Sequence, residues 1–302
     1  MAHQHDHPAV AMQRKPHPDQ HRHRPGSPTA FRWSVILNTG LSAFQLVIGY
    51  AFGSLALIGD AVHNLGDVAG LLLGWGAERL STRPPVGRFT YGFGRSTQLA
   101  SLANGVLILM ASAVVLVEAM QRLMEPRPVE TGPVLWAAAA GIAVNLFSAR
   151  LFGSHQNHDL NRRAATVHLL TDAAVSAAVL VSALLVQISG QNWIDAFTAV
   201  GVGLAVAWSG FKLLRDALGI MLDAVPSGID MEEVAATLRG LPGVVDVHHV
   251  HVWALSTSQT ALTAHIVRRR DEVNDLDLLH EAKTRLAQLG IGHSTLQLEP
   301  EG

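Results

Sequence analysis

Four ionisable residues repeat one spacing in two long apolar segments of the sequence. His63 and Asp67 lie four residues apart within 55–77, and His168 and Asp172 lie four apart within 164–188. Residues at this spacing share one face of an α-helix, so each pair projects in one direction. Two imidazoles and two carboxylates suit a tetrahedral, borderline cation such as Zn²⁺, whereas Ca²⁺ and Mg²⁺ prefer oxygen ligands alone. The spacing therefore predicts a metal site between two helices.

Both pairs lie within segments that are predicted to cross the membrane, so their side chains would be inside the bilayer. An ionisable group there costs about 2.5–3.5 kcal/mol to insert, so it calls for a role. One His–Asp pair alone is equally compatible with a structural hydrogen bond, but two pairs of identical spacing favour a shared site. Asp60, three residues before His63, is a further candidate. It is either a carboxylate behind the ligands or at the entrance, or an interfacial group near the start of its segment.

The elements that must position these residues are apolar segments long enough to cross a bilayer as helices, which takes about 20 residues. Lys and Arg concentrate in the N-terminal tail and in the loops after the second, fourth and sixth segments. Basic loops stay on the cytoplasmic side, so we expect both termini there. The six predicted spans are 33–52, 55–77, 98–117, 134–152, 164–188 and 196–214.

The composition agrees with a membrane domain followed by a polar domain. Charged residues make up 15% of the 302 residues, below the ~25% of a soluble domain, and most lie in the tail, the loops and the last third. The chain has no cysteine, which excludes disulfides and thiolate metal sites. A net charge of −2 gives no reason to expect nucleic acid. Residues 1–28 lack the layout of a signal peptide, so we expect the first span to remain.

The last third predicts a small α+β domain. The pattern favours a helix over 231–241, strands over 244–255 and 261–267, a helix over 276–289 and a strand over 294–298. The order α-β-β-α-β indicates helices on one face of a sheet. In the first strand, Val247, His249, His251 and Trp253 are expected to alternate onto one face. The predicted domains are a tail at 1–30, a transport domain at 31–222 and a cytoplasmic domain at 223–302.

Histidines also gather outside the predicted spans. The tail reads as a flexible arm that collects metal, with a solvated tail of chance composition as the alternative. Solvation is the default for the loop pair His155 and His158. The tail histidines are His3, His5, His7, His17, His21 and His23.

Taken together, these motifs resemble the cation diffusion facilitator family, over about residues 33–299. The resemblance rests on 53–67, on the loop 89–95, on the pair His168/Asp172 and on 247–253. It implies six membrane helices, a ferredoxin-like cytoplasmic domain, a homodimer and proton-coupled metal export in the zinc, cadmium or cobalt branch. It also implies that the metal is carried by His63, Asp67, His168 and Asp172.

The resemblance further implies a regulatory metal site in the C-terminal domain. The positions that match its ligands are His251, His265 and Glu299, with His280 adjacent. The alternative is that these are surface or partly buried side chains of a small sheet. The loop between the second and third spans has Phe93 and no histidine, so we do not expect the additional site that some relatives carry there.

The function that the resemblance implies is export of Zn²⁺ from the cytoplasm, and we expect no resident cofactor and no enzymatic activity. Protons compete with metal for neutral imidazole, which makes proton exchange the natural coupling, and no phosphate-binding loop for ATP is present. We expect a lipid-embedded homodimer in a bacterial inner membrane. One alternative is a non-transporting metal sensor or partner subunit. A membrane metalloenzyme is disfavoured, because catalytic zinc keeps one position free of protein ligands.

Overall fold

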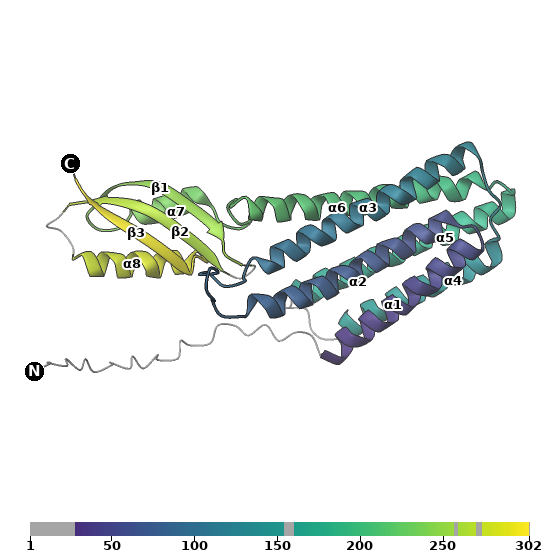
Figure 1. The fold of residues 1–302 in the computed structure, drawn as a ribbon, viewed down its shortest axis with the longest axis horizontal. Coiled ribbons are helices and arrows are strands. Elements are labelled where there is room, and N and C mark those ends of the chain that lie inside the picture. Colours follow the sequence, from purple (N-terminus) through teal and green to yellow (C-terminus); the bar gives the residue numbers. More distant parts are fainter. Residues whose placement is uncertain (1–27, 154–159, 257–258, 270–273, 302) are drawn as a thin grey trace, which may run out of the picture.

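The chain folds into a long helical bundle joined to a small α+β domain (Figure 1). The computed structural model describes residues 28–153, 160–256, 259–269 and 274–301. The tail histidines, His155 and His158 lie outside these ranges. In the described part of the chain the bundle consists of α1 (Pro28–Ala51), α2 (Leu55–Ser81), α3 (Ser96–Met124), α4 (Thr131–Gly153), α5 (Leu160–Ser189) and α6 (Trp193–Met221).

The predicted helical membrane domain is confirmed. The helices α2 to α6 each contain a window long and apolar enough to cross a bilayer, and α1 contributes a shorter apolar stretch, Val35–Ala51. Many large apolar side chains on the outside of the bundle are exposed, among them Trp136, Ile188 and Trp208. Such a surface is unfavourable in water and fits a lipid environment.

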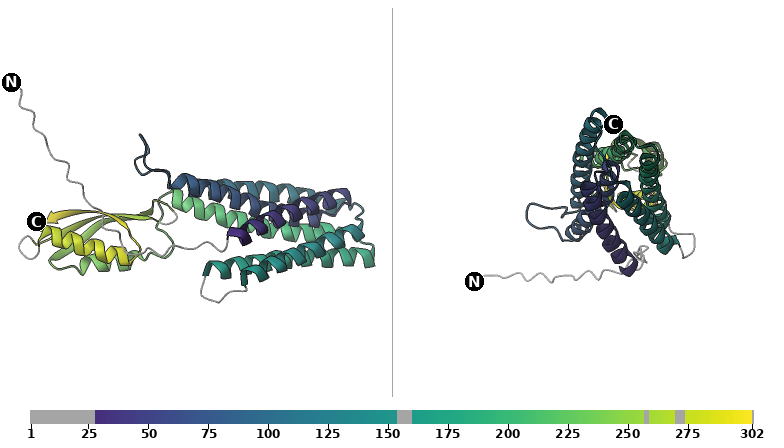
Figure 2. Two further views of the ribbon diagram at one scale, coloured as in Figure 1. Left: turned by 90° about the horizontal axis from the view of Figure 1, so that it is seen from below. Right: turned by 90° about the vertical axis from the view of Figure 1, so that its right-hand side faces the viewer.

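The helix α2 lies at the centre of the bundle. It contacts each of the other five bundle helices, while α3 packs along α6 and α4 along α5. In the left view of Figure 2, α4 and α5 form the lower edge of the bundle. The α3–α6 pair approaches closely at Gly105, where an added Cβ would lie 3.1 Å from the backbone nitrogen of Leu214. Small residues of this kind let membrane helices pack backbone to backbone.

The C-terminal domain has the predicted order α-β-β-α-β. It comprises α7 (Met231–Arg239), β1 (Val244–Ala254), β2 (Thr260–Arg268), α8 (Asp275–Gln288) and β3 (His293–Pro300). The sheet order is β1-β2-β3, with β1 antiparallel and β3 parallel to β2. Leu262, Ala264 and Ile266 alternate along β2 and pack with Leu238 of α7 and Leu278 of α8. Both helices therefore cover one face of the sheet and leave the other face uncovered by them.

The loop between α2 and α3 contacts the C-terminal domain and its linker. Arg95 forms an ion pair with Asp223, just after α6. The rings of Tyr91 and His293 lie 6.2 Å apart, edge to face. We call the end of the bundle nearest this domain the domain end, and the opposite end, with the turns 52–54 and 190–192, the far end (Figure 1).

Candidate metal centre

The structure brings the four predicted residues of α2 and α5 into one group. His63 Nε2 lies 3.2 Å from Asp172 Oδ1, and His63 Nδ1 lies 3.8 Å from Asp67 Oδ2. His168 Nε2 lies 3.4 Å from Asp67 Oδ2 and 3.7 Å from Asp172 Oδ2. Each carboxylate thus sits between the two imidazoles, and the four side chains close a ring across the interface of the two helices.

The spacing of these atoms matches part of what a tetrahedral zinc ion requires. His63, Asp67 and Asp172 offer ligand atoms that all lie within 4.8 Å of one another, and His168 joins them through its contacts to the two carboxylates. Nitrogen and oxygen ligands lie about 2.0–2.2 Å from Zn²⁺, so ligand atoms of a tetrahedron lie roughly 3.3–3.6 Å from each other. The contacts at His168 Nε2, 3.4 and 3.7 Å, and the 3.2 Å contact at His63 Nε2 fall close to this range. His63 presents a different nitrogen to each carboxylate, so a bound ion would use one of them after a small turn of the ring.

Exposure within the group rises toward the domain end. The side chains of Asp172 and His63 form the far level of the ring, and those of Asp67 and His168 form the next level, about one helical turn nearer the domain end. The exposed fractions are 3% for Asp172, 14% for His63, 28% for Asp67 and 51% for His168. The group is therefore closed to solvent on the far-end side, at Asp172, and accessible to solvent on the domain-end side, at His168.

Asp60 lies behind this group and contacts two neighbouring helices. Its Oδ2 accepts hydrogen bonds of 2.8 Å from Gln45 Nε2 of α1 and from Ser176 Oγ of α5. Asn64 Nδ2 donates to Gln45 Oε1 at 3.3 Å, which adds a second link between α1 and α2. All four of these side chains are buried. The network fixes α2 against α1 and α5 one turn before His63.

Gln45 and Ser176 could not be predicted as partners of Asp60, because nothing in the local sequence pattern shows that α1 and α5 meet there. The signal that could have indicated them is that Gln45 and Ser176 are polar residues within otherwise apolar helices. Asn145 of α4 is a further buried polar residue, and its amide nitrogen and oxygen have no hydrogen-bond partner among the described residues. Buried polar groups of this kind are costly in a membrane protein and mark places where helices are not held by apolar packing alone.

A second group of potential ligands lies on the sheet of the C-terminal domain. His265 Nδ1 is 2.8 Å from Glu299 Oε1, and His248 Nε2 is 3.4 Å from Glu299 Oε2. The rings of His248, His249 and His265 lie 5.1–5.3 Å from one another. These side chains occupy the face of the sheet opposite α7 and α8, because the alternate residues of β2 point into the helix-covered core.

The strand β1 does not alternate as the sequence suggested. The pairing with β2 shifts between His248 and His251, and His249 has a left-handed backbone with φ of 51°. This bulge brings both His248 and His249 to His265, although neighbouring strand residues normally face opposite ways. Of the residues expected at this site, His265 and Glu299 are in the group. His251 instead lies in a hollow with Trp253 and Asp223, and His280 is exposed on α8.

Two models of known protein families together match nearly the whole chain. The sequence profile described as the cation efflux transmembrane domain matches residues 32–222. The profile described as the cytoplasmic domain of a cation efflux protein matches residues 226–301. The first profile covers all six helices of the bundle except the first turn of α1, and the second covers the α+β domain.

Individual relatives match at similar coverage. The chain is 34% identical over 266 residues to the zinc transporter ZitB of Escherichia coli, which covers 87% of this chain and 84% of that protein. It is 31% identical over 280 residues to the metal cation efflux system protein CzcD of Cupriavidus metallidurans, covering 92% and 89%. It is 29% identical over 272 residues to the cadmium, cobalt and zinc/H(+)-K(+) antiporter of Bacillus subtilis, covering 89% and 88%.

Proposed function

Since this chain belongs to the cation diffusion facilitator family of metal cation efflux transporters, we propose that it exports Zn²⁺ in exchange for protons. It is a multi-pass membrane protein with a C-terminal domain of the cytoplasmic type. The observation that carries the proposal is the ring of two imidazoles and two carboxylates between α2 and α5. We assign His63, Asp67, His168 and Asp172 as the transport ligands.

The donor set supports zinc as the principal substrate. Two nitrogens and two oxygens fit a borderline cation, and the same set accepts Cd²⁺ or Co²⁺ as secondary substrates. The names of the relatives agree with this range, since one is called a zinc transporter and another a cadmium, cobalt and zinc antiporter. Zinc is here the transported substrate and not a resident cofactor.

Competition for the imidazoles supports proton exchange. His63 and His168 bind metal only as neutral rings, so a proton on either ring displaces the ion. Metal would enter from the domain end, where His168 is half exposed, and protons arriving from the far end would release it there. The Bacillus subtilis relative is named as an antiporter for H(+) and K(+), which supports exchange of metal for protons.

The orientation and assembly follow from the same family. We place the domain end and both termini in the cytoplasm, because the C-terminal domain matches the cytoplasmic domain of cation efflux proteins. We place the protein in a bacterial inner membrane, since the similar proteins come from bacteria. Asp60 supports the ligands from behind and does not bind the ion. It acts by holding α2 to Gln45 of α1 and Ser176 of α5.

We propose that the chain forms a homodimer through its C-terminal domain, which matches the cytoplasmic domain of cation efflux proteins, and that this domain carries a regulatory metal site. We assign His248, His249, His265 and Glu299 to that site, because they converge on the sheet face that α7 and α8 leave free. A face of this kind, with three histidines and one carboxylate, can take Zn²⁺ at the surface of one protomer. Zinc held there would report the cytoplasmic metal level to the transport domain through the contacts of the α2–α3 loop.

The experiment that tests the proposal is Zn²⁺ flux into proteoliposomes under an imposed pH gradient. Wild type is compared with Asp67→Ala and Asp172→Ala, and with Asp216→Ala as the control. Asp216 is an exposed carboxylate on α6 that pairs with its neighbour Arg215. We expect the pH gradient to drive flux in wild type and control, and both ligand substitutions to abolish it.

Two outcomes would count against the proposal. Flux that survives both ligand substitutions would mean that the metal path lies elsewhere. Absence of flux in well-folded wild type, with zinc still bound by the C-terminal domain, would favour a metal sensor or partner subunit that does not transport.

A further inference from the structure

The far end of the bundle is tightly packed around the start of α2. A cluster of small and apolar side chains is buried there, including Leu57 of α2, Val134 of α4, Val179 and Ala183 of α5, and Ala199 of α6. Leu57 lies six residues before His63, and Val179 lies seven residues after Asp172. Because α2 runs from the far end and α5 toward it, this cluster separates the metal centre from the far end.

A single carboxylate of α6 caps α2 within this packed region. Asp195 Oδ1 accepts a hydrogen bond of 2.6 Å from Ser54 Oγ, and its Oδ2 accepts one of 2.6 Å from the backbone nitrogen of Leu55. The backbone nitrogen of Ala56 donates to the same Oδ2 at 3.3 Å. Asp195 is only 2% exposed. The first N–H groups of a helix lack partners within it and carry partial positive charge, so a buried carboxylate is a strong partner for them.

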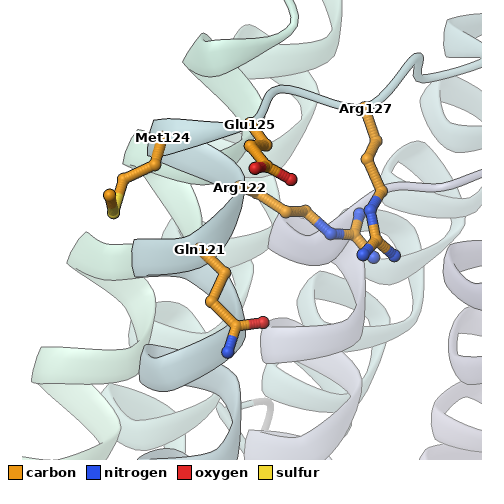
Figure 3. Close-up of a pocket in the computed structure, with 5 residues that line it drawn as sticks. All are labelled: Gln121, Arg122, Met124, Glu125 and Arg127. Atoms are coloured by element: carbon orange, nitrogen blue, oxygen red, sulfur yellow. The ribbon is translucent and has the colours of Figure 1, made fainter.

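Other contacts hold the turn before α2 in the same position. Arg122 Nη1 of α3 donates to the carbonyl oxygen of Gly53 at 2.6 Å, and the backbone nitrogen of Glu130 donates to the carbonyl oxygen of Phe52 at 3.0 Å. Figure 3 shows Arg122 and Arg127 extending toward each other, and Arg127 lies 3.7 Å from Glu118. These contacts fix the turn from α3 and from the α3–α4 loop. Asp195 reaches the N-terminal backbone of α2 from another helix, and Ser54 Oγ also accepts a hydrogen bond of 3.2 Å from the backbone nitrogen of Leu57.

From these contacts we infer that Asp195 is a positioning residue that keeps the far end closed while the metal centre is accessible from the domain end. The inference rests on the proposed transport function. A metal ion at His63 can leave by the far end only if Leu55–Leu57 separates from α5 and α6. That movement breaks the cap, because Asp195 belongs to α6 and its three partners belong to Ser54 and the first turn of α2.

The absence of cysteine from the chain makes the closure directly measurable. Ala183→Cys places a single thiol in the far-end cluster, where Ala183 is 2% exposed. Its neighbour Ser182 lies level with the start of α6, since Ser182 Oγ donates to the Ile194 carbonyl oxygen at 3.4 Å. The rate of labelling by a charged maleimide, measured on the full chain in detergent, then reports how often the far end opens to water.

The test compares this thiol in the parent chain, with Asp195→Asn, with Ser54→Ala and with Glu125→Gln as the matched control. Glu125 is an exposed carboxylate at the same end. We expect labelling about ten-fold faster with Asp195→Asn, a smaller acceleration with Ser54→Ala, and no change with Glu125→Gln. Zinc affinity, measured by calorimetry on the same samples, should stay within about two-fold because the metal ligands are untouched.

Labelling that is no faster in either variant, with zinc binding retained, would overturn the inference. Loss of zinc binding in both variants would also overturn it, since Asp195 would then support the whole bundle and not the far end alone. Thiol labelling needs no transport, so its result is separate from the proposed function. A parent chain that fails to carry zinc would overturn that function and leave the labelling comparison intact.

Discussion

At the scale of single residues, the grouping of His63, Asp67, His168 and Asp172 could be predicted from the sequence, and the grouping on the sheet of the C-terminal domain only in part. The transport pairs are local, because a helix fixes residues four apart on one face whatever surrounds it. The cytoplasmic group depends on a bulge at His249, where the backbone is left-handed with φ of 51°. The sequence of a strand predicts only that neighbouring side chains face opposite sides of the sheet, and the bulge changes this alternation at His248 and His249. His265 and Glu299 were found, whereas His248 and His249 were not.

The buried carboxylate at the metal centre should dominate zinc affinity. Asp172 contacts both imidazoles and is 3% exposed, so Asp172→Asn removes an anionic ligand that water cannot replace. Loss of groups behind metal ligands costs 10–100-fold in affinity, so loss of a ligand should cost about 100-fold or more. Titration calorimetry in detergent on a chain with His265→Ala, which removes the second site, measures this. A loss below about three-fold would contradict the assignment of Asp172.

The two histidines should set the pH dependence of zinc binding at the same centre. Each imidazole that must release a proton to bind metal adds up to one unit to the slope of log affinity against pH on the acid side. Affinity should therefore rise with pH, with a limiting slope near two for the parent chain and near one for His168→Gln. Affinities measured across the acid range in buffers that do not bind zinc give both slopes. Equal slopes in the two proteins would contradict a role for His168 as ligand.

At the scale of elements, the apolar segments predicted all six bundle helices, since length and hydropathy are properties of each segment alone. Apart from the meeting of α2 and α5 at the two His–Asp pairs, the contacts between helices could not be predicted from the sequence. Asp60 is 15 positions from Gln45 and 116 positions from Ser176 in the sequence, although it is hydrogen-bonded to both. Close approach of α3 and α6 at Gly105 likewise depends on how two distant segments pack.

That close approach predicts an asymmetry between two glycines. A Cβ at Gly105 would lie 3.1–3.2 Å from the backbone and Cβ of Leu214, whereas one at Gly201 of α6 would meet nothing within 4 Å. Gly105→Val should therefore push α3 from α6 and destabilise the bundle by about 1–3 kcal/mol, the usual cost of overpacking. Gly201→Val should change stability little. The midpoints of thermal unfolding in one detergent compare them, and equal midpoints would contradict the observed packing.

At the scale of the whole molecule, the proposed metal centre between α2 and α5 and the cluster of His248, His249, His265 and Glu299 lie in separate units joined at the domain end. The loop after α2 contacts the C-terminal domain through Tyr91 and reaches the linker after α6 through the Arg95–Asp223 ion pair. The helix that carries His63 and Asp67 is thus followed directly by the segment that contacts the second unit. This arrangement lets metal bound to the sheet influence α2 without sharing a ligand with it.

Separate units predict that each site can still fill when the other is removed, while transport depends on one of them. Equilibrium dialysis of the full chain should show that His265→Ala and Asp172→Asn each remove about one bound zinc per chain, and that the double variant removes both. Their effects on flux should differ. Asp172→Asn should abolish pH-driven zinc flux because it opens the ligand ring, whereas His265→Ala should keep flux and change only its dependence on the zinc level at the domain end. Loss of flux in His265→Ala, with the transport site still filled, would show that the C-terminal domain takes an obligatory part in the transport cycle.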